Sequence, residues 1–127
     1  MSRAGAVLYA KDVDRVASFY AGVAGLSLRA EAGHAELHAP GFRLVVVKIP
    51  DAIARTISIA SPPAPRESTP IKLVFPVASL DEARAAASRL GGAMNAAEKE
   101  WRDEGCRVCD GHDPEGNLFQ LHEIGRA

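Results

Sequence analysis

Two different spacing patterns of apolar residues follow each other at the start of this chain. Residues 6–10 form a short apolar run, and Asp12 then stands where a helix N-cap is expected, ahead of apolar side chains that recur at helical spacing as far as Tyr20. Gly22 and Gly25 end that spacing. The pattern predicts a strand followed by a helix of about three turns.

Strand-like segments fill the rest of the first half. Alternating or β-branched apolar residues occur in three stretches, at residues 26–30, 35–38 and 42–49. Turn sequences at Gly33 and at Pro40-Gly41 separate them. The first half is therefore predicted to have the order β-α-β-β-β.

The second half repeats this order. Residues 71–75 predict a strand, and Ser79 with Glu82 forms a Ser-x-x-Glu capping box for a helix that ends at Gly91-Gly92. Two further strands are expected at residues 93–99 and 106–110, with Trp101 in the polar turn between them. The turn Asp113-Pro114-Glu115-Gly116-Asn117 then leads into a last alternating strand.

We expect a single α+β domain over residues 1–127. Module 1 covers about residues 4–57, a proline-rich connecting loop covers 58–70, and module 2 covers about 71–125. Pairing two βαβββ modules buries their half-covered sheets and leaves a curved cleft of the kind that binds small molecules. The other interpretation is a chance repetition within an ordinary α+β domain.

Composition narrows the range of partners. The 15 Lys and Arg against 16 Asp and Glu give a net charge of −1 without a basic stripe, so no nucleic acid partner is expected. The apolar run at residues 44–47 is far shorter than the roughly 20 residues of a membrane span, so no membrane partner is expected. Two cysteines and no secretory signal indicate the cytoplasm.

Two segments resemble a known family. The stretch at residues 7–20, with Phe19-Tyr20 on the first helix, and the ending Asp113-Pro114-Glu115-Gly116-Asn117 are similar to the glyoxalase, bleomycin resistance and extradiol dioxygenase superfamily, also called vicinal oxygen chelate. The resemblance covers nearly the whole chain. It implies paired βαβββ modules that form an open eight-stranded barrel-like cleft, a small-molecule ligand and a homodimer.

The resemblance also implies a test for a metal. Enzymes of this family hold a divalent ion with His, Gln or Glu from the first and last strands of the modules. These positions fall on Gly5, Val45 (or Leu44 with a one-residue shift), Lys72 and Gln120. Only Gln120 has an oxygen to offer. We therefore expect no metal and no other cofactor.

The same strands predict a set of ligand-binding residues. Alternation places Tyr9, Lys72, Gln120 and His122 on the cleft face, and Trp101 lies where family members often close the pocket. Lys72 among valines favours an anionic or carbonyl-bearing ligand, and Tyr9 suits a planar one. The alternative for Trp101 is an edge aromatic that covers the core or a dimer contact.

Three functions remain open at this stage. The leading hypothesis is a metal-free binding protein, similar to the antibiotic-sequestering branch of the superfamily. The alternative is an enzyme: a metal-dependent lyase, isomerase or dioxygenase-like protein with a shifted site at His122, Gln120 and His38, or a metal-independent one with Lys72 and Tyr9 as acid and base. The third is a structural or regulatory partner domain.

Two smaller constellations are interpreted as structural. Cys106-Arg107-Val108-Cys109 matches C-x-x-C, but cysteines three apart on a strand point to opposite faces, and no second pair completes a zinc site. His34 and His38 share a strand face, while Glu36 is expected on the opposite face, which leaves them without a third metal ligand.

Overall fold

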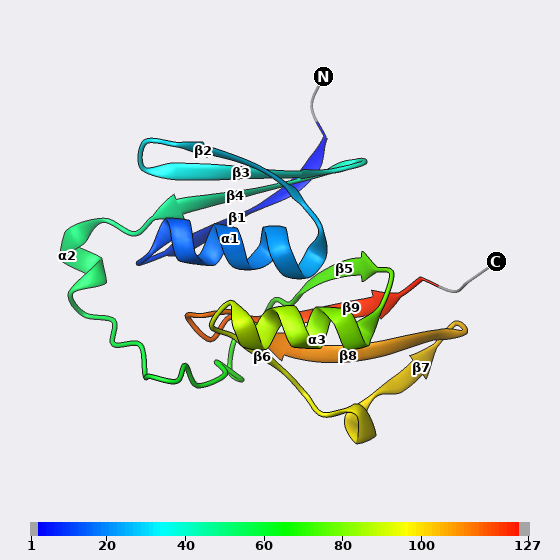
Figure 1. The fold of residues 1–127 in the computed structure, drawn as a ribbon. Coiled ribbons are helices and arrows are strands. Elements are labelled where there is room, and N and C mark those ends of the chain that lie inside the picture. The colour runs from blue at the N-terminus through cyan, green and yellow to red at the C-terminus, as the bar shows by residue number, and fades with distance from the viewer. Residues whose placement is uncertain (1–2, 125–127) are drawn as a thin grey trace.

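The computed structural model describes residues 3–124, which form two sheets with helices between and beside them (Figure 1). Sheet A has the strand order β1 (Ala4–Ala10), β4 (Phe42–Lys48), β3 (His34–Ala39) and β2 (Ser27–Glu31). Strands β1 and β4 are parallel, and the other pairs are antiparallel. Helix α1 (Val13–Ala24) connects β1 to β2.

Sheet B repeats this topology. Its order is β5 (Leu73–Val77), β9 (Leu118–Glu123), β8 (Cys106–His112) and β6 (Ala93–Met94), with β5 and β9 parallel and α3 (Leu80–Arg89) after β5. A first strand paired in parallel with the last strand of its own module recurs in both halves, so the predicted α+β fold of two βαβββ modules is confirmed. The two sheets are not closed into a barrel.

The second strand of module 2 differs from the prediction. A continuous strand over residues 93–99 is wrong: β6 ends at Met94, a 3-10 helix η1 follows (Ala97–Lys99), and pairing with β8 resumes in β7 (Trp101–Asp103). Trp101 thus lies on a strand instead of in a turn. The detour brings the carboxylate of Glu100 between Arg84 and Arg107, whose side chains both donate to it.

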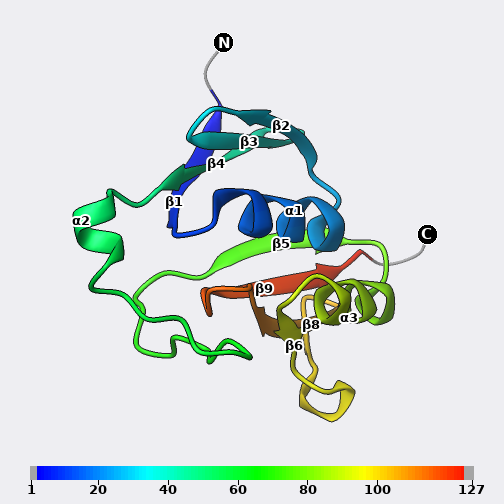
Figure 2. The ribbon, with the colours of Figure 1, turned by 60° about the vertical axis from the view of Figure 1, so that its left-hand side comes forward.

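A long connection joins the modules. Helix α2 (Asp51–Ala54), which the sequence pattern did not predict, is followed by a segment without helix or strand up to β5. Figure 2 shows this segment passing around one side of the molecule. It is fixed where the Arg66 amide donates to the carbonyl of Gly116 at 2.8 Å. No helix within residues 3–124 has the length and apolar character needed to cross a bilayer.

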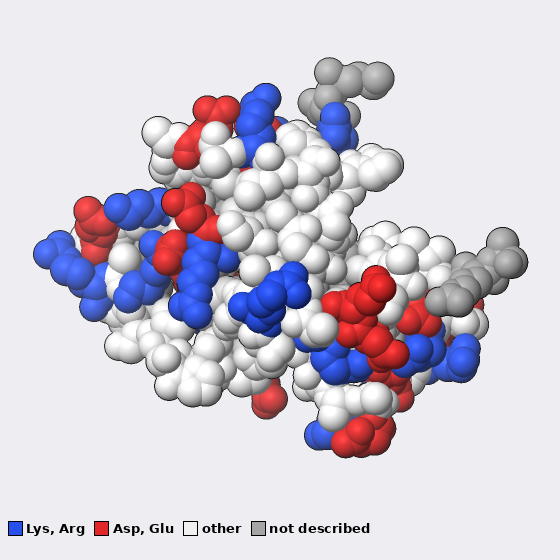
Figure 3. All heavy atoms as spheres, viewed as in Figure 1, with Lys and Arg blue, Asp and Glu red and all other residues white. Residues whose placement is uncertain are grey.

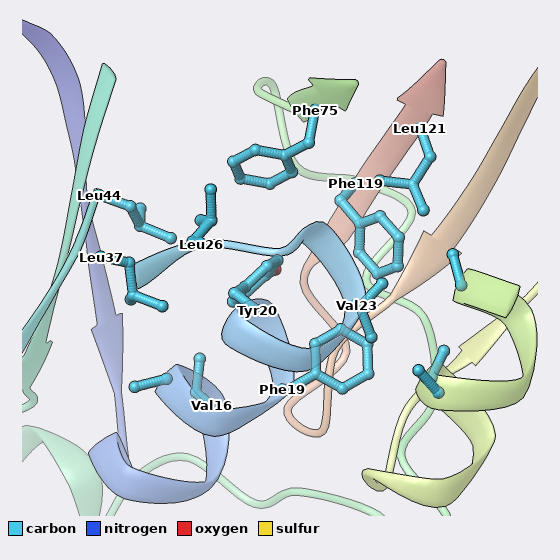
Figure 4. Packing of buried hydrophobic residues seen from close by; sticks show 14 of the residues in the cluster. Val16, Phe19, Tyr20, Val23, Leu26, Leu37, Leu44, Phe75, Phe119 and Leu121 are labelled. Atoms are coloured by element: carbon cyan, nitrogen blue, oxygen red, sulfur yellow. The ribbon is translucent and has the colours of Figure 1, made fainter. Parts of the chain in front are cut away.

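The hydrophobic core is shared by both sheets. Helix α1 places Phe19 and Tyr20 between Leu37 and Leu44 of sheet A on one side and Phe119 of sheet B on the other (Figure 4). The rings of Phe19 and Phe119 lie 5.6 Å apart. Because the helices cover the inner face of each sheet, the opposite, outer faces point away from the core.

Helix ends follow the predicted local chemistry. The side chain of Asp12 accepts a hydrogen bond from the Arg15 amide, and Gly25 ends α1 in the left-handed conformation at φ 69°. The side chain of Ser79 caps α3 by accepting from the Glu82 amide. These caps fix both helices at positions that the sequence marks clearly.

The Asp-Pro-Glu-Gly-Asn turn holds the two modules together through hydrogen bonds. The carboxylate of Asp113, which is fully buried, accepts hydrogen bonds from the Tyr20 hydroxyl at 2.8 Å and from the amides of Glu115 and Asn117. The carboxylate of Glu115 in turn accepts from the amides of Lys11 and Asp12, just ahead of α1. This turn therefore anchors module 2 to the first helix of module 1.

Candidate functional site

Four of the five predicted ligand-binding residues lie on the outer face of sheet B. Register places Gln120 beside Asp110, and His122 in one row with Val108 and Trp101. Lys72 immediately precedes β5, two residues before Val74, which pairs with Gln120 across the sheet. Their neighbours Phe119 and Leu121 point into the core, as strand alternation requires. The structure thus brings Lys72, Trp101, Gln120 and His122 onto one surface.

These side chains form a continuous hydrogen-bonded chain. Lys72 Nζ donates to Asp110 Oδ2 at 2.8 Å, and Gln120 Nε2 donates to Asp110 Oδ1 at 3.2 Å. The imidazole Nε2 of His122 lies 2.8 Å from Gln120 Oε1. Asp110 is the functional residue that sequence reasoning missed. Its place two residues before His112 on an alternating strand was the available signal.

Asp110 changes the role expected of Lys72. The ammonium group and the Asp110 carboxylate are an ion pair, and both side chains remain partly accessible. A compensated charge attracts an anion much less than a free ammonium does, so Lys72 does not by itself favour an anionic ligand. It does hold the Asp110 carboxylate in place for Gln120.

Tyr9 lies elsewhere. It belongs to the outer face of sheet A with Val7, and both side chains are 59% exposed. Because α1 lies between the sheets, the outer faces of one chain point away from each other (Figure 1). Within a single chain, Tyr9 therefore does not share a cavity with the other four residues, which corrects the expected common pocket.

The outer face of sheet A also carries a charged cluster. Glu36 contacts His38 at 3.2 Å, Arg29 at 3.1 Å and Arg43 at 3.3 Å, and His34 lies 3.9 Å away. The expectation that Glu36 points to the opposite face is wrong, since residues 34, 36 and 38 alternate onto one face. Burial opposes ionisation of Glu36, but the two arginines outweigh it and lower the pKa of its carboxyl.

The positions where the superfamily holds a metal do not fit one here. A side chain at Gly5 has no room, because an added Cβ would collide with the carbonyl oxygen of Arg43. Val45 offers no donor atom, Lys72 is an ammonium in an ion pair, and the oxygen of Gln120 faces His122. Within residues 3–124, no three His, Cys, Asp or Glu side chains are grouped as a metal site requires.

The two cysteines do not form a site together. Cys109 is buried in the core, whereas Cys106 is partly exposed, and neither is in a disulfide. Burial raises the pKa of the Cys109 thiol, although the neighbouring Arg84 acts in the opposite direction. A buried thiol that resists ionisation behaves as a small apolar side chain.

A groove runs between the two sheets, but none of the five predicted ligand-binding residues lines it. Its volume is about 570 Å³, and residues of β1 and of the approach to β5 line it, including Gly5, Val7 and Leu73, with Tyr20 and Phe42. Both strands are the edges of their sheets, so the groove exists only because the modules pack edge beside edge. Of the four metal positions of the superfamily, only Gly5 lines this groove.

Charge is mixed on the face drawn in Figure 3, where acidic and basic side chains are interspersed near α2 and around α3 and β7. The dense group near α3 includes Arg84, Arg107 and Glu100. Burial opposes ionisation of Glu100, but hydrogen bonds and charge from both arginines lower the pKa of its carboxyl.

Comparison with known proteins gives a consistent result. A family model described as a glyoxalase-like domain matches residues 5–122. A search of curated proteins finds no match to the chain.

Solved structures with the same fold span nearly the whole chain. A glyoxalase/bleomycin resistance protein from Albidiferax ferrireducens T118 has 16% identity and a TM-score of 0.68, over 96% of this chain and 98% of its own. A mutant of FosX from Listeria monocytogenes, complexed with Mn(II) and 1S,2S-dihydroxypropylphosphonic acid, has 19% identity and a TM-score of 0.64, over 98% and 92%. TioX from Micromonospora sp. ML1 has 21% identity and a TM-score of 0.63, over 97% and 98%.

Proposed function

Because the chain belongs to the glyoxalase-like domain family, we propose that it is a member without the metal centre that binds a small planar molecule against the outer face of sheet B. The match of the family model confirms the family relationship that was predicted from the sequence. The ligand contacts in this proposal are Lys72, Trp101, Gln120 and His122, with Tyr9 supplied from a second copy of the chain.

The observation that carries the proposal is the lack of space around Gly5. The position that should hold the first metal ligand lacks a side chain and has no space for one. The other three positions offer one amide oxygen, which already faces His122. A divalent ion requires several donors at once, so binding without a metal is the function these residues support.

Exposed apolar residues support a homodimer. Val7 and Tyr9 on sheet A are 59% exposed and Val74 on sheet B is 51% exposed, and each lies on an outer face. Exposed apolar patches of this kind mark interaction sites. If sheet A of one copy faces sheet B of another, a cleft closes between them, and Tyr9 meets the other four residues there.

Binding without chemistry is the proposed activity. The names of two structural neighbours refer to bleomycin and fosfomycin, so planar antibiotics and phosphonates form a sensible first screen. Because the charge of Lys72 is compensated, anionic compounds have no advantage over neutral planar ones in this screen.

A thermal-shift screen tests the metal and ligand parts. A compound that binds only the folded state raises Tm, and the added stability grows with the logarithm of its concentration over Kd. We expect planar aromatic compounds to raise Tm and divalent metals to leave it unchanged. A stoichiometric divalent ion in the purified protein, lost on His122→Ala together with an activity, would instead establish the enzyme alternative.

Mass measurement in solution tests the dimer. We expect light scattering to give twice the chain mass for the wild type, and half of that for Val7→Glu, since a buried charge at the interface is costly. Val7→Thr, of similar shape and uncharged, is the matched control and should remain dimeric. A monomeric wild type would contradict the shared cleft.

A further inference from the structure

The hydrogen bonds that connect Lys72, Asp110, Gln120 and His122 on sheet B have a defined donor-to-acceptor direction. An ionised carboxylate only accepts hydrogen bonds, and Asp110 receives Lys72 Nζ on one oxygen and the amide of Gln120 on the other. The Gln120 amide must therefore turn its NH₂ group toward Asp110. Its oxygen, Oε1, then faces His122 at 2.8 Å.

This direction fixes the tautomer of His122. A carbonyl oxygen only accepts, so His122 Nε2 must carry a proton and donate it to Gln120 Oε1. In the neutral imidazole the other nitrogen, Nδ1, then has a free lone pair. Lys72, Asp110 and Gln120 thus act as positioning residues that determine which ring nitrogen accepts.

The lone pair of Nδ1 is open on the outer face. No hydrogen bond within residues 3–124 involves Nδ1 of His122, and no buried side-chain nitrogen or oxygen in that range lacks a partner. Nδ1 therefore reaches solvent. Trp101 occupies the same row of the sheet across Val108, and it is partly exposed.

We infer that His122 Nδ1 is a hydrogen-bond acceptor that selects planar ligands bearing a hydroxyl group, with the indole of Trp101 as the stacking surface. This specificity rests on the proposed binding face of sheet B. A hydroxyl donates to Nδ1, whereas its methyl ether cannot, and a ligand that lacks the donor leaves the acceptor unsatisfied. Hydroxylated rings should bind about tenfold tighter than their ethers, the ratio expected for one net hydrogen bond.

The tautomer is tested without any ligand. ¹⁵N NMR of the neutral imidazole should show His122 Nδ1 unprotonated and a slowly exchanging proton on Nε2. Gln120→Met keeps the shape of residue 120 but removes the acceptor, so the slow proton should be lost while the signals of His34, on sheet A, stay in place. A proton on Nδ1 in the wild type, or no change in Gln120→Met, would overturn the inference.

Ligand selection is tested with 1-naphthol and 1-methoxynaphthalene. Trp101 is the only tryptophan, so quenching of its fluorescence reports binding at this face. The wild type should prefer the naphthol about tenfold, and His122→Phe should bind both compounds equally. Equal affinities in the wild type, or no binding of either compound, would refute the selectivity, whereas the metal and dimer tests of the proposed function would be unaffected.

Discussion

Tyr20→Phe isolates one buried hydrogen bond that joins the two modules. The Tyr20 hydroxyl donates to Asp113 Oδ2 at 2.8 Å, and both residues are buried. A phenylalanine keeps the ring against Phe75 and Phe119. The variant therefore loses the hydroxyl and leaves Asp113 Oδ2 with the Asn117 side chain alone.

Removal of this single oxygen atom is expected to lower the free energy of unfolding substantially. A hydrogen bond to a charged group contributes about 1.5–3 kcal/mol, and both partners here are buried. We expect the free energy of unfolding to fall by about 2 kcal/mol and Tm to fall by roughly 8 °C for a domain of this size.

Urea denaturation followed by circular dichroism measures this loss. The m-value should be unchanged, because the surface exposed on unfolding is nearly the same. Tyr9→Phe is the matched control: its hydroxyl makes no hydrogen bond within residues 3–124, and its side chain is exposed, so a change below about 0.5 kcal/mol is expected. Equal stabilities of the two variants would refute the reasoning.

The same residue predicts a dependence on alkaline pH. Burial, then the charge of Asp113 and the hydrogen bond to it, raise the pKa of Tyr20 well above 10.0. In the unfolded chain the phenol ionises near that value, so its stabilising contribution is complete below about pH 10 and is lost as the pH rises further. Above pH 10 the wild type should lose about 1.4 kcal/mol per pH unit more than Tyr20→Phe.

Three further outcomes are expected. Gly5→Ala should lower the free energy of unfolding by about 2 kcal/mol in urea titrations, because the added methyl collides with the Arg43 carbonyl; a neutral effect would show that β1 has room for a ligand side chain. Ellman's reagent should modify one thiol of the native protein, absent in Cys106→Ser, and reach Cys109 only after unfolding; two rapidly reacting thiols would contradict the burial of Cys109. Glu100→Gln should be less stable than wild type at pH 7, because the two arginines stabilise the ionised Glu100 carboxylate and lower its pKa. The difference in stability should shrink as the pH falls below 4.5 and the carboxylate becomes protonated. A difference that does not change with pH would be inconsistent with its two arginine partners.

Local signals in the sequence were sufficient for the helices and the repeat. An N-cap such as Asp12 or Ser79 and a stop such as Gly25 act within one helical turn, so the residues themselves specify them. Both halves share one element order, and the structure adds that the first and last strands of each half pair in parallel.

Long-range contacts decided what the sequence left open. Where a strand over residues 93–99 was predicted, only β6 forms, and the chain then brings Glu100 to Arg84 and Arg107, residues from two other elements. Asp110 escaped notice for the same reason, since its partners Lys72 and Gln120 are 38 and 10 residues away in the chain.

The sequence by itself determined the β-α-β-β-β order of the two modules, the helix caps, and the lack of donors at the metal positions. Only the tertiary structure decided that α1 lies between the sheets, and hence that Tyr9 and His122 belong to outward faces of opposite sheets. The physical reason is that strand alternation fixes which side chains share one face of a strand. Which layer then covers that face depends on packing between segments far apart in the chain, and the periodicity of the sequence does not predict this packing.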